Sequence, residues 1–179
     1  GGGHSPVDAA LMSRFPNLKI VANFGVGYDT VDAAWAGTHG IFVTNTPDVL
    51  TEEVADTALG LLLMTVRQLS QSERHLRAGR WESEGPFPLT PATLRERKVG
   101  IVGLGRIGKA IAHRLEAFGT PIVYHGRSQQ GDVVYPYYPR LKDMARDVDV
   151  LMLVAPGGSE THHMVDAEIL DALGSDGIL

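Results

Sequence analysis

The 179-residue sequence contains no cysteine, carries little net charge and has no long hydrophobic run. The absence of cysteine excludes disulfides, thiolate catalysis and cysteine-ligated zinc sites, and it is consistent with the cytoplasmic location that we expect. The formal net charge is −5 at pH 7, so no global basic field attracts nucleic acid. The longest apolar stretch, Ala58 to Met64, is far shorter than a membrane span. We therefore expect neither nucleic acid nor a membrane as a partner.

The sequence does contain a glycine-rich turn between a predicted strand and a predicted helix. Val99 to Val102 is a short apolar run typical of a buried parallel strand. The turn that follows is Gly103-Leu104-Gly105-Arg106-Ile107-Gly108. In this G-x-G-x-x-G pattern Gly103 allows a tight turn, Gly105 leaves room for a pyrophosphate, and Gly108 lets the helix pack close to the strand.

The start of the helix after this turn supplies hydrogen-bond donors. The N–H groups of Arg106 and Ile107 would face the phosphates of a dinucleotide, where the helix dipole also favours negative charge. Glycine-rich turns also occur without a ligand, so a purely structural turn is the alternative. The position between a strand and a helix favours a dinucleotide site.

A second predicted strand, Pro121 to His125, is followed by Gly126-Arg127-Ser128. Folds that prefer NAD carry an acidic residue at this point to bind the ribose 2′-hydroxyl. Arg127 would instead attract a 2′-phosphate, and the Ser128 hydroxyl would add a hydrogen bond. The alternative is a solvated surface arginine. The pattern favours NADP(H) over NAD(H).

The rest of the sequence predicts alternating helices and strands. Before the turn they are a helix from Ser5 to Arg14, a strand from Leu18 to Phe24, a helix from Val31 to Ala36, a strand from Ile41 to Thr44 and a helix from Glu52 to about Arg77. After it they are a helix from Leu141 to Arg146, a strand from Val148 to Val154, a helix from Asp166 to Leu173 and a strand that starts at Ile178. Residues Trp81 to Pro91 predict a linker or lid.

This order predicts an α/β fold with a Rossmann-type doubly wound parallel sheet. Such a sheet has six strands in two halves, and this sequence supplies one half. We therefore expect a piece of a longer protein, with a complete short protein as the alternative. The helix from Glu52 is apolar on almost all sides, which predicts burial between two domains or two subunits.

Five motifs occur in the order and spacing of a known family. They are Asn23 to Asp29, Asn45 to Thr51, Val54 to Asp56, Gly103 to Gly108 and Ala155 to Gly158. The chain resembles the D-isomer-specific 2-hydroxyacid dehydrogenases, and among them the glyoxylate/hydroxypyruvate reductases. The resemblance implies part of a flavodoxin-like substrate domain in residues 1–51, an interdomain helix and linker in 52–96, and the N-terminal half of an NAD(P)-binding domain in 97–179.

The resemblance also implies the site residues. The backbone N–H groups of Val26 and Gly27 would bind the substrate carboxylate, and Val54 would lie against the nicotinamide. The remaining cofactor contacts would come from Gly103, Leu104, Gly105, Arg106 and Ile107 at the pyrophosphate, Gly126, Arg127 and Ser128 at the 2′-phosphate, and Ala155 and Pro156 near the middle of the dinucleotide. Without the resemblance, a plain turn at Gly27 and simple core packing of Val54 remain alternatives.

The implied activity is NADPH-dependent reduction of a small 2-oxo acid, such as glyoxylate or hydroxypyruvate, to the D-2-hydroxy acid. The family also implies a homodimer, with the helix after Thr51 at its interface. The family's catalytic arginine, glutamate and histidine have no counterpart in this sequence, its seven histidines match no catalytic motif, and no metal-binding spacing occurs. A dinucleotide-sensing protein similar to the co-repressors of this fold, or an inactive fragment, remains an alternative.

Overall fold

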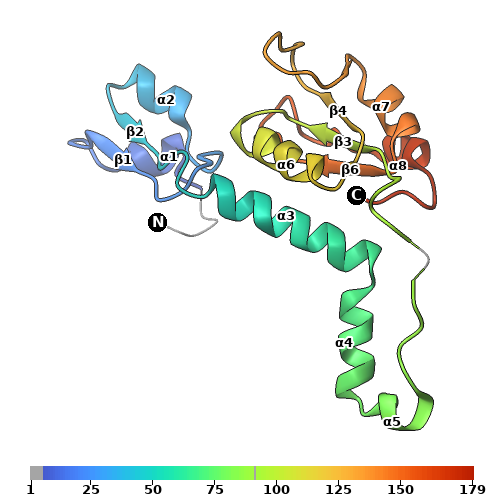
Figure 1. Ribbon diagram of the computed structural model, residues 1–179. Coiled ribbons are helices and arrows are strands. Elements are labelled where there is room, and N and C mark those ends of the chain that lie inside the picture. Colours follow the sequence, from blue (N-terminus) through green and yellow to red (C-terminus); the bar gives the residue numbers. More distant parts are fainter. Residues whose placement is uncertain (1–5, 91) are drawn as a thin grey trace. The chain divides into compact units, whose positions relative to one another are not determined.

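The computed structural model describes residues 6–90 and 92–179 (Figure 1). The chain divides into two compact units. The first comprises the residues up to Leu50 together with Pro156–Met164, and the second comprises Thr51–Ala155 and Val165–Leu179.

The second unit is built on a parallel sheet with the strand order β5-β4-β3-β6. The strands are β3 (Val99–Val102), β4 (Ile122–His125), β5 (Tyr137–Tyr138) and β6 (Val150–Leu153). Val99 pairs with Ile122 on one side and Val150 on the other, and all four residues of β3 are buried. Ile178 extends the order with a parallel bridge to Val150. β5 was not predicted, because two residues between prolines are too short to show a periodic pattern.

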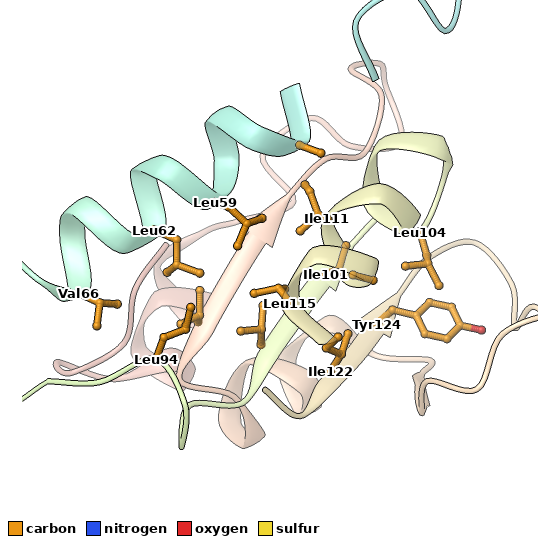
Figure 2. Close-up of a cluster of buried hydrophobic side chains, with 14 residues drawn as sticks. Leu59, Leu62, Val66, Leu94, Ile101, Leu104, Ile111, Leu115, Ile122 and Tyr124 are labelled. Carbon is orange, nitrogen blue, oxygen red and sulfur yellow. The ribbon is translucent and has the colours of Figure 1, made fainter. Parts of the chain in front are cut away.

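Helices cover both faces of this sheet. On one face α3 (Thr51–Val66) packs against α6 (Arg106–Glu116), and on the other α7 (Leu141–Asp147) packs against α8 (Ala167–Leu173). Figure 2 shows the core under α3 and α6, which includes Leu59, Leu62, Ile111, Leu115 and Ile101. On the opposite face Gly100 faces Met144 of α7 at 3.2 Å from the position of an added Cβ. The predicted Rossmann-type α/β class is confirmed.

The predicted helix from Glu52 to Arg77 is wrong as a single element. It is two helices, α3 and α4 (Leu69–Arg77), and Gln68 between them has a left-handed backbone with φ of 53°. Arg67, at the break, donates from Nη1 to the Ala92 carbonyl at 2.8 Å. The buried residues of α3 end at Val66 and α4 has none, so no buried face continues through the break.

A further detail differs from the sequence pattern. A short helix, α5 (Arg80–Glu84), lies in the segment predicted as a linker, and it begins after Gly79 at φ of 70°. The helix α3 buries one face within the described residues, through Ala55, Leu59, Leu62 and Val66, while Leu61 is 60% exposed. Burial of its other side between two domains or two subunits stays a prediction.

The first unit has fewer residues than the second. It contains α1 (Ala9–Met12), β1 (Ile20–Ala22), α2 (Ala33–Thr38) and β2 (Phe42–Thr44), and β1 and β2 pair in parallel. Asp8 caps α1 by accepting a hydrogen bond from the Leu11 N–H at 2.8 Å, whereas Ser5, where the sequence predicts the helix to start, lies outside the described residues. Asp32 caps α2, because Val31 forms a bridge to Val7 instead of starting the helix.

Candidate functional site

The Gly103–Gly108 turn has the geometry that its sequence predicts. Gly103 has φ of 95°, and a Cβ there would lie 2.7 Å from the Ala155 Cα. A Cβ on Gly108 would lie 2.3 Å from the Gly103 carbonyl oxygen. By contrast, no heavy atom of the described residues beyond its chain neighbours lies within 4 Å of a Cβ built on Gly105. Gly103 and Gly108 therefore allow close packing, while Gly105 faces open space.

The start of α6 is suited to an anion. Gly105 occupies the N-cap position and has no side chain to cap the helix, and its carbonyl accepts the Lys109 N–H at 2.8 Å. The first N–H groups of an α-helix lack partners within the helix and carry partial positive charge. Donors beside an open space at Gly105 fit a dinucleotide pyrophosphate.

The predicted 2′-phosphate loop follows β4 at the same edge of the sheet. The Gly103 N–H donates to the His125 carbonyl at 2.8 Å, which joins the turn to the end of β4. Arg127 and Ser128 are exposed in the loop. Arg127 makes no hydrogen bond or ion pair with any described residue, so its guanidinium is free to meet an anionic ligand.

Ala155 completes this edge from a third strand. Val102 pairs with Leu153, and the Val154 N–H donates to the Val102 carbonyl at 3.0 Å. The second unit thus brings the Gly103–Gly108 turn, the loop after β4 and Ala155 to the carboxyl ends of three neighbouring parallel strands. Ligands of open α/β sheets bind at this edge.

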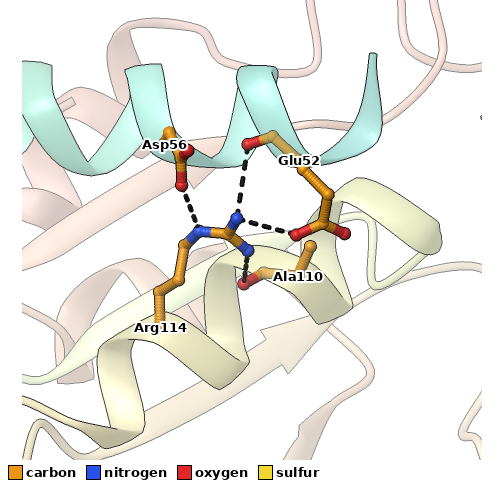
Figure 3. A network of polar contacts seen from close by, with 4 residues as sticks. All are labelled: Glu52, Asp56, Ala110 and Arg114. Atoms are coloured by element: carbon orange, nitrogen blue, oxygen red, sulfur yellow. Dashed lines mark hydrogen bonds and ion pairs between the residues drawn. The ribbon is translucent and has the colours of Figure 1, made fainter. Parts of the chain in front are cut away.

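Val54 lies near the start of α3 and is 38% exposed, so it is not part of the hydrophobic core. Figure 3 shows how α6 holds this end of α3. Arg114 donates from Nε to Asp56 Oδ1 at 2.6 Å and from Nη2 to Glu52 Oε2 at 2.7 Å. Hydrogen bonds to Glu52 and Asp56 raise the pKa of Arg114. The helix that carries Val54 is therefore fastened to the helix that follows the glycine-rich turn.

The Gly25–Gly27 loop lies in the first unit and is shaped by two asparagines. Asn23 Nδ2 donates to the carbonyls of Gly27 at 2.8 Å and Gly25 at 3.3 Å, and Asn45 Nδ2 donates to the Val26 carbonyl at 2.8 Å. The carbonyls are thus occupied, while the N–H groups of Val26 and Gly27 donate no hydrogen bond to any described residue. A loop whose donors are free and whose acceptors are satisfied is suited to a carboxylate.

Pro156 belongs to the first unit, although its neighbour Ala155 belongs to the second. The segment after Pro156 adjoins the Gly25–Gly27 loop through Asp29. The Asp29 carboxyl carbon lies 3.3 Å from a Cβ built on Gly157, and its Oδ2 lies 3.1 Å from one built on Gly27. The predicted site residues therefore form one group in each unit.

Among the described residues, no group of three or more histidine, aspartate or glutamate side chains is placed to hold a metal ion. In the same part of the chain, no helix is both long and apolar enough to span a bilayer.

Comparison with known proteins identifies the family. Residues 59–179 match the D-isomer specific 2-hydroxyacid dehydrogenase, NAD binding domain. The chain belongs to the D-isomer specific 2-hydroxyacid dehydrogenase family. It is 48% identical over all 179 residues to glyoxylate/hydroxypyruvate reductase A HPR2 of Arabidopsis thaliana, of which it covers 56%. It is 39% identical to the glyoxylate reductase of Thermococcus onnurineus, with 97% of this chain and 54% of that protein covered.

A solved structure of a family member has the same fold. The NADPH-dependent glyoxylate/hydroxypyruvate reductase of Sinorhizobium meliloti, in complex with NADP and malonate, superimposes with a TM-score of 0.93 at 57% identity. The match covers 97% of this chain and 54% of that one. This chain therefore spans about half the length of the dehydrogenases that it matches.

Several residues that shape the candidate site in this chain were missed by sequence reasoning. Asn23 and Asn45 were noted only as parts of motifs, and Arg114 was not noted at all. A signal for both asparagines was available in the sequence. Asn23 lies just before Gly25-Val26-Gly27, and Asn45 lies directly after the next predicted strand. Arg114 carried no signal, because its partners lie far away in the sequence.

Proposed function

We propose that the protein to which this chain belongs is an NADPH-dependent reductase of small 2-oxo acids. Its products are D-2-hydroxy acids, and glyoxylate and hydroxypyruvate are the expected substrates. The names of its relatives in Arabidopsis thaliana and Sinorhizobium meliloti support this activity. The observation that carries the proposal is the open Gly105 turn joined directly to a loop that presents Arg127 and Ser128.

The residues of the second unit would hold the cofactor. The N–H groups between Leu104 and Ile107 would bind the pyrophosphate, and Arg127 would pair with the 2′-phosphate through charge-assisted hydrogen bonds. Val54, Ala155 and Pro156 would contact the nicotinamide half and the middle of the dinucleotide. NADPH, when bound, supplies a hydride.

The free N–H groups of Val26 and Gly27 would bind the substrate carboxylate. Two backbone donors fix the acid group without a cationic side chain, so this loop selects for a carboxylate and not for a particular side chain. The occupied carbonyls support this assignment, since Asn23 and Asn45 prevent them from facing the ligand.

In the whole protein, we assign residues 1–51 to a substrate domain, 52–96 to an interdomain helix and linker, and 97–179 to the first half of the dinucleotide domain. The change of unit between Leu50 and Thr51 supports the first boundary. A cytoplasmic location is part of the same proposal, and cell fractionation tests it.

We propose that the whole protein forms a homodimer. The support is a group of exposed apolar side chains: Leu69 and Leu76 on α4, Trp81 on α5 and Leu89 beyond it are exposed at 48%, 59%, 54% and 90%. In Figure 1, the helices α4 and α5, which carry the first three of these residues, extend away from the sheet. Exposed apolar side chains of this density mark a protein interface. Sedimentation at several concentrations tests the assignment, and a monomer at all of them would contradict it.

The cofactor choice is tested by Arg127→Asp in the whole protein. The change replaces attraction to the 2′-phosphate by repulsion, so the Kd for NADPH should rise by about 100-fold, while the Kd for NADH should change by less than about threefold. Arg95→Asp, at another exposed arginine of the second unit, is the control for charge reversal and should change neither. An equal loss for both cofactors at Arg127 contradicts the assignment.

Steady-state rates on a panel of 2-oxo acids test the reaction. Glyoxylate and hydroxypyruvate should be reduced with NADPH. If the whole protein binds NADPH tightly and reduces no 2-oxo acid, the enzyme assignment is wrong and a dinucleotide-sensing role replaces it.

A further inference from the structure

The loop that presents Arg127 is attached to the glycine-rich turn by one glutamine. Gln130 donates from Nε2 to the Leu104 carbonyl at 2.8 Å, and its own backbone N–H donates to the Tyr124 hydroxyl at 2.7 Å. Tyr124 is 1% exposed and Leu104 is 2% exposed, so both partners belong to the packed core. Figure 2 shows the Tyr124 ring near Leu104, with its hydroxyl at the edge of the cluster. Gln130 therefore ties the end of an exposed loop to two fixed points.

The other end of the loop is attached as well. Tyr137 donates from its hydroxyl to the Gly126 carbonyl at 3.1 Å, and its ring centroid lies 5.3 Å from that of Tyr124. Arg127 and Ser128 lie between the two attachments and are exposed. The loop that carries Arg127 and Ser128 is thus attached on both sides of these two residues.

An ion pair joins the segment after Gln130 to α6. Asp132 is the first carboxylate after β4, and Lys109 of α6 pairs with it at 2.8 Å. The hydrogen bond from Lys109 lowers the pKa of Asp132, so the pair stays ionised. This pair fastens the segment after Gln130 to the helix that begins at the glycine-rich turn.

We propose that Gln130 is a positioning residue for cofactor selectivity, acting by holding Arg127 and Ser128 at a fixed distance from the pyrophosphate-binding turn. This inference rests on the proposed NADPH site. NADPH carries two anionic groups, the pyrophosphate and the 2′-phosphate, at a separation set by its covalent structure. A site that binds both gains affinity when the turn and the loop that bind them are held rigidly. Without the bond to Leu104, the loop can move relative to the turn. The 2′-phosphate contacts then weaken, whereas the pyrophosphate contacts do not.

The test is Gln130→Ala in the whole protein, with Kd measured for NADPH and NADH by the change in nicotinamide fluorescence. The loss of one positioning hydrogen bond should raise the Kd for NADPH by about three- to tenfold and leave the Kd for NADH within about twofold. In turnover, the KM for NADPH should rise while kcat stays the same. Tyr124→Phe removes the hydroxyl that accepts the Gln130 N–H and keeps the buried ring. It should also raise the ratio of the NADPH Kd to the NADH Kd.

Two controls separate positioning from general damage. Gln129→Ala removes the neighbouring glutamine, which makes no hydrogen bond with the described residues, and it should leave the ratio unchanged. In an Arg127→Ala background, Gln130→Ala should alter the ratio much less, because the charged residue of the loop is gone and only Ser128 remains to be positioned.

The outcomes are distinguishable. If the unsubstituted protein does not prefer NADPH, the proposed cofactor choice fails. If it does prefer NADPH and Gln130→Ala leaves the ratio unchanged, or weakens both cofactors equally, only the positioning role is overturned. If Gln129→Ala raised the ratio of the NADPH Kd to the NADH Kd as much as Gln130→Ala does, the positioning role would also be overturned, since the effect would then not come from the bond to Leu104.

Discussion

Two glycine-containing loops follow parallel strands in this molecule, and they keep their shapes by opposite means. The Gly103–Gly108 turn depends on absent side chains, because a Cβ at Gly103 or Gly108 would meet backbone atoms at 2.7 or 2.3 Å. The Gly25–Gly27 loop depends on side chains that are present, because Asn23 and Asn45 occupy its carbonyls. The first loop is fixed by packing, and the second by polar contacts.

The strands before the two loops differ in the same way. All of β3 is buried, so the turn after it starts from the centre of a packed core. In the first unit only Val21 and Val43 are half-buried in the paired strands, while Ile20 and Phe42 are 53% and 74% exposed. A loop that follows such exposed strands needs specific hydrogen bonds to hold one conformation.

The largest expected effect comes from Gly108→Ala. The new methyl group would overlap the Gly103 carbonyl oxygen, which is backbone and cannot move without distorting the turn. We expect a loss of about 3 kcal/mol in the free energy of unfolding, measured with urea. Gly60→Ala is the control, because its Cβ has no neighbour within 4 Å among the described residues and alanine favours a helix. A loss below about 1 kcal/mol at Gly108 would show that the turn is not fixed by packing.

The next largest effect is on binding and not on stability. Gly105→Val places a side chain in open space, so the unfolding midpoint should change little. The same side chain would occupy the position proposed for the pyrophosphate, and the affinity for both NADPH and NADH should fall at least about 100-fold, or about 2.7 kcal/mol. Calorimetric titration measures the affinity. Unchanged binding of either cofactor would restrict this turn to a structural role.

A smaller effect is expected at the polar loop. Asn45→Asp keeps the shape of the side chain but replaces the donor to the Val26 carbonyl by a charged acceptor. The KM for the 2-oxo acid should rise about tenfold, while the Kd for NADPH stays the same. Asn17→Asp, at an exposed position of the same unit, is the matched control. A rise in both constants would mean that the two loops are not independent.

The smallest effect is expected from Gly25→Ala. An added Cβ would lie 3.4 Å from Asn23 Nδ2, an ordinary contact, and the backbone there does not require a positive φ. The free energy of unfolding should change by less than about 1 kcal/mol. If Gly25→Ala proves as damaging as Gly108→Ala in urea unfolding, the contrast between the loops disappears.

The sequence predicted most of the fold and the position of the glycine-rich turn. Strands such as Val99 to Val102 and the amphipathic α6 are local patterns with a period that burial imposes. The break at Gln68 was missed because hydrophobic periodicity does not report a single left-handed residue. β5 was missed because its two residues belong to the sheet only through pairing with Tyr124 and His125.

The sequence by itself was enough to propose a class of ligand at the turn, since three glycines at fixed spacing and an arginine after the next strand are local features. The family resemblance was likewise readable from the sequence, because it rests on five short motifs in a fixed order. Only the tertiary structure decided which glycines are needed for packing, which asparagines orient the Gly25–Gly27 loop, and that Gln130 joins two segments of the site. The physical reason is that these are contacts made only in the folded chain, some of them between residues far apart in it. A sequence pattern records what each residue is but not what it touches.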